Sequence, residues 1–112
     1  MDAQLKRGIA EVCVLAVLRS GDSYGYQIVK DISPHMPISE STLYPILKRL
    51  ELSGFVSVYS VEHNSRLRKY YRITPHGHQR ISAFVQEWHE LLDIATFIKS
   101  TEKIAEEGGQ AT

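Results

Sequence analysis

The segment SESTLYPILKRLELSG, residues 39–54, carries the clearest structural signal of the chain. Ser39 is a favourable helix N-cap and Gly54 a favourable stop, so the pattern predicts a helix that ends at Ser53. Apolar side chains recur in it at i, i+3, i+4 and i+7, which places them together on a buried face. That face consists of Leu43, Ile46, Leu47 and Leu50. The opposite face and its margins carry Ser41, Thr42, Tyr44, Pro45, Lys48, Arg49 and Leu52.

Two further helices are expected before this segment. Residues 5–19 are apolar almost all round, and a helix of that kind must be covered on several sides. The turn pair Gly21-Asp22 ends it. The next helix is predicted over residues 24–33, with Ser23 as its N-cap. The first half of the chain therefore predicts a run of helices joined by short turns.

A β-hairpin is predicted after these helices. Residues 55–61 and 67–73 alternate between apolar and polar side chains, as strands do, and residues 62–66 form the loop between them. The side chains expected on the apolar faces are Phe55, Tyr59 and Val61 of the first strand and Leu67, Tyr71 and Ile73 of the second. The other face of the second strand carries Arg68, Tyr70 and Arg72.

Charge is distributed unevenly along the chain, although 13 basic and 13 acidic side chains cancel in total. Residues 1–62 carry a net charge of −1, residues 63–80 carry +5, and the remainder from Ile81 carries −4. The basic side chains of the middle block are Arg66, Arg68, Lys69, Arg72 and Arg80. Such a block on a hairpin is either a solvated loop or the electrostatic footprint of an acidic partner.

The last third of the chain predicts one long helix. Thr74-Pro75 is a strong start, an N-cap followed by proline, and the helical pattern extends to Glu107. Steps of three and four residues form a heptad seam from Ile81, Phe84, Trp88, Leu91, Ala95 and Ile98. A second apolar edge is formed by Val85, Leu92, Ile94 and Phe97. One small domain cannot cover both edges, so the simplest arrangement is a symmetric dimer. The alternative is that the first half of this helix folds back onto its own chain.

This order of elements predicts an α+β, mainly helical fold, a winged helix-turn-helix with a long C-terminal dimerisation helix. We place the winged domain at residues 1–74, the dimerisation helix at residues 75–107 and a disordered tail at residues 108–112. In such a fold the third helix enters the major groove of double-stranded DNA and the hairpin is the wing. Hydroxyl and amino groups of the third helix can reach base edges, while basic side chains of the wing neutralise phosphates.

Several short motifs follow one another in a specific order. They are Gly8 to Leu18, Tyr24-Gly25-Tyr26-Gln27-Ile28, Ser39 to Glu51, Gly54, Arg68-Lys69-Tyr70-Tyr71 and Ile73-Thr74 with Gly77. Together they resemble the PadR family of bacterial transcriptional regulators over about residues 5–92, and the short C-terminal region resembles its compact branch. The sequence departs from the family at three places: Ser41 replaces a usual glycine, Asn64-Ser65 stand where glycine is common, and Leu67 where proline is common.

The resemblance implies a homodimeric regulator, usually a repressor, whose dimer forms through its first and last helices. It implies phosphate contact by Tyr24, groove contact by Ser41, Thr42, Tyr44, Pro45 and Lys48, and wing contact by Arg68 and Lys69. We add Ser39, Arg49 and Arg66 from their positions on the third helix and the wing. The dimer residues expected are Leu5, Ile9 and Val12 of the first helix and Phe84, Trp88, Leu91, Leu92 and Ala95 of the last.

The resemblance also implies a small-molecule site at Trp88, the only tryptophan of the chain. In the compact branch a tryptophan at this place stacks on flat aromatic or hydrophobic effectors that loosen DNA binding. A ligand of this kind acts only if it prefers the dimer geometry that misplaces the third helices. The alternative is that Trp88 is an ordinary packed residue of the dimer seam.

Other kinds of site have weak support in the sequence. A lone Cys13 in the most apolar helix excludes a disulfide framework and suits a reducing cytoplasm. His89 and Asp93 have metal-ligand spacing, but two such residues are common by chance. Because no catalytic constellation or phosphate loop is present, we expect no enzyme and no cofactor. The longest apolar run is too short to cross a membrane.

Two alternatives to a ligand-responsive DNA-binding regulator stay open. The first is a winged-helix adaptor that binds proteins and not DNA, which the basic wing disfavours. The second is a metal- or redox-responsive regulator of the same fold, which would depend on Cys13 or on His89 and Asp93. Salt dependence of DNA binding distinguishes the first alternative, and dependence on a chelator or an oxidant distinguishes the second.

Overall fold

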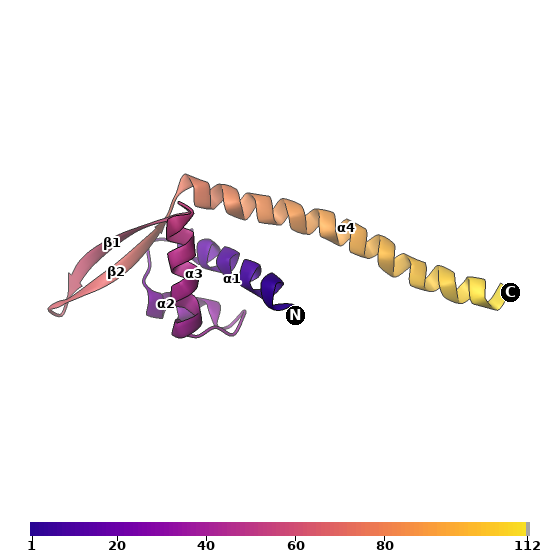
Figure 1. The fold of residues 1–112 in the computed structure, drawn as a ribbon, viewed down its shortest axis with the longest axis horizontal. Coiled ribbons are helices and arrows are strands. Elements are labelled where there is room, and N and C mark those ends of the chain that lie inside the picture. The colour runs from indigo at the N-terminus through magenta and orange to yellow at the C-terminus, as the bar shows by residue number, and fades with distance from the viewer. Residues whose placement is uncertain (112) are drawn as a thin grey trace. The chain divides into compact units, whose positions relative to one another are not determined.

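The computed structural model describes the backbone of residues 1–111 and the side chains of residues 1–102. Its elements follow one another in the order α1 (Ala3–Leu18), α2 (Gly25–Ile32), α3 (Glu40–Leu52), β1 (Val56–His63), β2 (Arg66–Ile73) and α4 (Pro75–Ala111) (Figure 1). This order confirms the mainly helical winged helix-turn-helix fold that the sequence predicts. The chain divides into two compact units, residues 1–81 and the segment that begins at Ser82.

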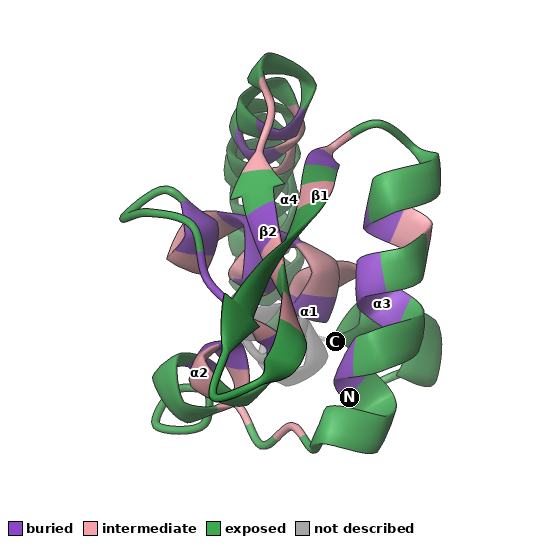
Figure 2. Ribbon diagram, turned by 90° about the vertical axis from the view of Figure 1, so that its left-hand side faces the viewer, coloured by how far each residue is buried: buried purple, intermediate pink, exposed green. Residues whose placement is uncertain are grey.

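The first unit is built around an apolar core to which α1 and α3 contribute most (Figure 2). The predicted inner face of α3 is confirmed, because its members are 3% exposed or less: Leu43, Ile46, Leu47 and Leu50. The expectation that α1 is covered on several sides is also confirmed by its buried residues, Ala10, Val12, Val14, Leu15 and Leu18. Burial of each large aliphatic side chain contributes roughly 1.5–3 kcal/mol, so this core holds the helices in place.

Capping side chains set the starts of α1 and α3. The Asp2 carboxylate accepts a hydrogen bond from the Leu5 amide at 3.1 Å, so α1 begins at Ala3, earlier than predicted. At α3 the predicted cap is confirmed, since the Ser39 hydroxyl accepts a hydrogen bond from the Thr42 amide at 3.3 Å.

The prediction that Ser23 caps α2 is wrong. Tyr24 occupies the N-cap position, and its side chain makes no capping hydrogen bond. Ser23 pairs with Tyr71 of β2 through two backbone hydrogen bonds of 2.8 and 3.2 Å, which hold it in a bridge and away from the helix start. The connector between α1 and α2 therefore lies along the wing.

The wing is an antiparallel hairpin whose register runs from Val56↔Ile73 to His63↔Arg66. Its tip is a two-residue turn, Asn64-Ser65, with φ values of 50° and 64°. Positive φ at both turn residues is typical of the type I′ turn, in which asparagine is favoured. The loop is thus shorter than the sequence pattern indicated, and the strands continue further toward the tip.

The apolar face predicted for β1 is wrong. Val56 is buried and Val58 half-buried, whereas Tyr59 and Val61 are exposed. Because side chains alternate along a strand, an error of one residue in phase inverts every assignment. On β2, Tyr71 is buried as expected, but Leu67 is 78% exposed because it lies beside the wing tip, beyond the core.

The start of α4 agrees with the sequence prediction. The Thr74 hydroxyl accepts a hydrogen bond from the Gly77 amide at 3.1 Å and donates one to the Gly54 carbonyl at 2.7 Å. Helix α4 continues to Ala111, past the predicted end at Glu107, and Thr112 lies outside the described residues. Gly108 and Gly109 have weak helix propensity, yet the helical backbone continues through both.

The second unit presents large apolar side chains to solvent. The large apolar residues exposed between Ser82 and Glu102 are Val85, Trp88, Leu91, Leu92, Ile94, Phe97 and Ile98. Phe84 and Trp88 stack within this unit, with ring centroids 6.4 Å apart. No helix in the described part of the chain has the length and hydropathy that crossing a bilayer requires.

Candidate nucleic-acid interface

The outer face of α3 is open to solvent along its length. Of the residues that the sequence placed on this face and its margins, all but Arg49 are exposed: Ser41, Thr42, Tyr44, Pro45, Lys48 and Leu52. At its start, the Ser39 hydroxyl lies 3.0 Å from the hydroxyls of both Ser41 and Thr42. This cluster gathers small donors and acceptors at the first turn, the part of a recognition helix that reaches base edges.

Arg49 differs from the other predicted contact residues of α3. Its Nε donates a hydrogen bond to the Glu11 Oε1 of α1 at 2.9 Å, and its Nη2 is buried without a hydrogen-bond partner. The guanidinium therefore links α3 to α1, unlike the other side chains of the outer face, which point to solvent. No short-range pattern pairs residues so far apart in the chain, so the sequence did not reveal this link.

An aromatic and cationic stack joins the start of α2 to the wing. The Arg68 guanidinium lies 4.1 Å from the centroid of the half-buried Tyr24 ring. Tyr70 meets Tyr24 edge-on at 5.5 Å and stacks on Tyr59 at 5.7 Å. Cation–π and aromatic contacts of this kind hold the Arg68 side chain at a defined position. Tyr24 and Arg68, which were predicted separately as DNA-binding residues, are thus in direct contact with each other.

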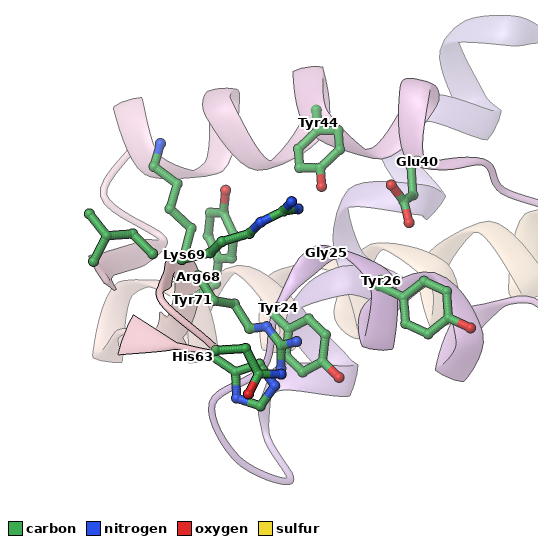
Figure 3. A pocket seen from close by; sticks show the side chains of 12 residues that line it. Tyr24, Gly25, Tyr26, Glu40, Tyr44, His63, Arg68, Lys69 and Tyr71 are labelled. Atoms are coloured by element: carbon green, nitrogen blue, oxygen red, sulfur yellow. The ribbon is translucent and has the colours of Figure 1, made fainter. Parts of the chain in front are cut away.

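A cavity of about 690 Å³ opens between the start of α2, the start of α3 and the wing (Figure 3). Its tyrosine side chains come from α2, its N-cap, α3 and β2, and its basic side chains from the wing. The lining consists of Tyr24, Gly25, Tyr26, Glu40, Tyr44, His63, Asn64, Arg66, Leu67, Arg68, Lys69 and Tyr71. Gly25 permits the close approach of α2 to α3, because a Cβ there would lie 2.9 Å from the Tyr44 hydroxyl. The cavity is suited to a polyanion, since Arg66 and Lys69 are exposed at its edge.

The four basic side chains of the hairpin divide into two groups in the structure. Arg66, Arg68 and Lys69 line the cavity, whereas Arg72 forms an ion pair with Asp22 at 2.8 Å. Hydrogen bonds from Arg72 and then from Tyr59 hold the pKa of the Asp22 carboxyl below its ordinary value, so it is ionised at neutral pH. The charge of Arg72 is therefore neutralised locally and does not add to the positive surface of the cavity.

Several residues at or near the cavity were not among the predicted DNA-binding residues, and three of them are informative. Tyr26, which is 57% exposed, and Glu40 line the cavity, and Asp22 binds the wing. Tyr26 could have been inferred from its place in the Tyr24-Gly25-Tyr26 motif at the start of α2. Asp22 could not, because it follows a turn glycine and its partners are distant in the sequence.

The residues predicted for a dimer interface belong to different units. On α1, Leu5 is 46% exposed and Ile9 half-buried, but Val12 is only 7% exposed and has little surface left for another chain. On α4, Phe84 is half-buried, and the remaining predicted residues are exposed: Trp88, Leu91, Leu92 and Ala95. The apolar surface available to a partner is therefore largest on α4.

The weaker candidates gain no support from the geometry. Burial raises the pKa of the half-buried Cys13 thiol, which lowers the fraction of reactive thiolate. Among the described residues, no group of three or more His, Cys, Asp or Glu side chains could hold a metal ion, so His89 and Asp93 stand without a third ligand.

The sequence and the fold are similar to those of known proteins. The model of the transcriptional regulator PadR-like family matches residues 14–83. A transcriptional regulator from Clostridium thermocellum is 35% identical over 84% of this chain and 96% of its own, with a TM-score of 0.76. A PadR family regulator from Eggerthella lenta is 36% identical over 85% of each chain, with a TM-score of 0.77. PadR of Bacillus subtilis, solved in complex with operator DNA, is 24% identical over 69% of this chain and 46% of its own, with a TM-score of 0.65, and shares the fold.

Proposed function

This chain belongs to the PadR-like family of DNA-binding transcriptional regulators, which are not enzymes, and we propose that it is a homodimeric, cytoplasmic repressor of a specific operator. The observation that carries the proposal is the cavity between α2, α3 and the wing, with exposed basic side chains beside the open face of α3. The complex of Bacillus subtilis PadR with operator DNA supports it by analogy of fold.

In this proposal α3 reads the major groove. Ser41, Thr42 and Lys48 project donors and acceptors toward base edges, while Tyr44 and Pro45 supply apolar contacts. Arg66 and Lys69 contact phosphates from the wing, and Tyr24 contacts phosphate beside Arg68. Arg49 is the exception among the predicted residues, because its bond to Glu11 makes it a support for α3.

The second unit brings two copies of the chain together. Its exposed residues recur at the heptad spacing of a helix seam, and a partner of the same sequence offers a matching apolar surface. Two copies would present two α3 helices to two half-sites, which is how helix-turn-helix dimers select operators. On α1, Leu5 is exposed and Ile9 half-buried, so both retain surface that a second copy could contact.

The direct test is a titration of the purified protein into fluorescent duplex DNA from upstream of its own gene. Unrelated competitor DNA is present in excess, and the titration is repeated at two salt concentrations. Binding that survives the competitor and weakens steeply with salt supports sequence-specific recognition through several phosphates. If no duplex from a genomic library is retained either, the operator proposal fails, and a protein-binding adaptor becomes the better account.

Release by a planar aromatic or hydrophobic effector at Trp88 is the finer part of the proposal. The Trp88 ring is 42% exposed and lies parallel to Phe84, so a flat molecule can extend the stack. Because Trp88 is the only tryptophan, its fluorescence reports binding of a probe such as anilinonaphthalene sulfonate without ambiguity. Trp88→Ala should keep DNA affinity and lose release by the probe. Equal release from the variant and the original protein would refute this site.

A further inference from the structure

Asp22, in the connector between α1 and α2, binds both strands of the wing. Its Oδ2 accepts a hydrogen bond from the Tyr59 hydroxyl of β1 at 2.6 Å and one from Arg72 Nη2 of β2 at 2.8 Å. Arg72 Nε lies 3.1 and 3.2 Å from the two carboxylate oxygens, so the guanidinium contacts both of them. The same guanidinium lies 5.3 Å from the centroid of the Tyr59 ring.

The residues next to Asp22 continue the attachment along the wing. Ser23 exchanges two backbone hydrogen bonds with Tyr71, and Tyr24 meets Tyr70 edge-on. Three consecutive residues of the connector thus contact three consecutive residues of β2 in opposite order. A two-stranded hairpin is marginally stable alone, so a contact outside its base decides the direction in which it points.

The ion pair has a small role in overall stability. The Asp22 and Arg72 side chains are 26% and 62% exposed, and exposed pairs contribute little to folding. A carboxylate that receives hydrogen bonds from two strands at once instead restricts orientation, because rotation of the hairpin breaks them together. Lys69 lies midway along β2 and Arg66 at the tip, both further from the base of the hairpin than Arg72, so a rotation about the base displaces them more.

We propose that Asp22 is a positioning residue for DNA binding: it fixes the wing so that Arg66 and Lys69 reach phosphates while α3 lies in the major groove. The inference rests on the proposed function. It also explains why an acidic side chain is present beside the proposed DNA-binding surface, where a carboxylate alone would repel the phosphates. Arg72 then acts as the partner of Asp22 and not as a phosphate ligand.

The test uses the sign of the effect on DNA affinity. Asp22→Asn removes a negative charge, which by long-range electrostatics alone would strengthen binding to DNA. The matched control Glu62→Gln removes the same charge from an exposed position on β1 and should bind DNA equally or more tightly. Positioning predicts the opposite for Asp22→Asn, about tenfold weaker binding, the loss expected for one hydrogen bond to a charged group. It also predicts a shallower dependence of affinity on salt, because fewer phosphates are contacted.

Two further variants make the outcome decisive. Asp22→Glu restores a carboxylate and should recover most of the affinity and the salt dependence. Tyr59→Phe removes one hydrogen bond and keeps the ring, so it should weaken binding by a smaller factor even if Asp22→Asn does not fold. Binding by Asp22→Asn or Tyr59→Phe as tight as that of the original protein, with the same salt dependence, overturns the positioning role. Failure of the original protein to bind any duplex instead overturns the proposed function.

Discussion

In residues 1–81 most of the large aliphatic side chains of α1 and α3 are buried, whereas from Ser82 to Glu102 those of α4 are exposed. Leu15 and Leu43 are 0% exposed, but Phe97 is 67% and Ile98 60% exposed. Both regions are helical and carry apolar residues at helical spacing, so spacing alone does not separate them. The difference is whether other elements of the same chain cover the apolar face of the helix. The first region has its own core, and we propose that a second copy of the chain covers the apolar surface of the second region.

The largest expected effect is the loss of the dimer when α4 receives a charge. Leu91→Glu places a carboxylate in the proposed seam of both protomers. We expect the dimer dissociation constant to rise by about a thousandfold or more, because two unpaired charges would be buried. Sedimentation velocity at micromolar concentration then shows monomers. Gln86→Glu, a control on the same helix, should leave the dimer intact, and equal behaviour of the two variants would contradict the seam.

A core truncation tests the other region. Leu47→Ala removes a side chain that is 1% exposed, and we expect the free energy of unfolding to fall by about 3 kcal/mol. Chemical denaturation followed by circular dichroism measures it at fixed protein concentration. Leu52→Ala is the matched control on the same helix, since Leu52 is 78% exposed and its truncation should change stability by about 0.5 kcal/mol or less. Similar losses for both variants would mean that α3 packs by another face.

Removal of a wing cation has a moderate effect, confined to DNA binding. Lys69→Ala should weaken binding to all duplexes alike and reduce the slope of log affinity against log salt by about one. Anisotropy titrations over a series of salt concentrations measure that slope. Lys99→Ala, which removes a cation from α4, serves as the control and should leave it unchanged. A sequence-dependent loss in Lys69→Ala would instead assign this side chain to base recognition.

The smallest expected effect is a shift in one tyrosine titration. The Asp22 carboxylate accepts a hydrogen bond from the Tyr59 hydroxyl, which favours the neutral phenol and raises the pKa of Tyr59 above its ordinary value. Asp22→Asn should therefore lower the pKa of Tyr59. Nuclear magnetic resonance of ring-labelled tyrosine over a pH series follows this titration. No change at Tyr59 would mean that the hydrogen bond is absent in solution.

Local signals account for the parts of the fold that were predicted correctly. Ser39 and Thr74 cap their helices with side-chain hydrogen bonds to residues three positions on, so a short stretch of sequence contains the whole interaction. The buried face of α3 follows from helical spacing in the same way. The α4 prediction succeeded for its start and erred only in where the helix ends.

The parts that were missed depend on partners elsewhere in the chain. The phase of β1 is set by its pairing with β2, and an error of one residue placed Tyr59 on the wrong face. Ser23 is a favourable N-cap residue type, but its backbone pairs with Tyr71 of β2, and Tyr24 occupies the N-cap position instead. The bonds of Asp22 to Arg72 and of Arg49 to Glu11 join residues 50 and 38 positions apart, which no periodicity indicates. Candidate DNA-contacting residues could be named from the sequence, but the long-range side-chain bonds that hold their elements in place could not.

The mass of the protein–DNA complex tests most directly whether the first unit binds DNA while the second unit forms the dimer. Sedimentation equilibrium is carried out with the full chain and a retained operator duplex, at a salt concentration where binding is tight. We predict two chains of 12.7 kDa on one duplex and, for Leu91→Glu, one chain bound with much lower affinity. If the unaltered protein instead binds the duplex tightly as a single chain, that result contradicts the proposal that α4 brings two DNA-binding units together.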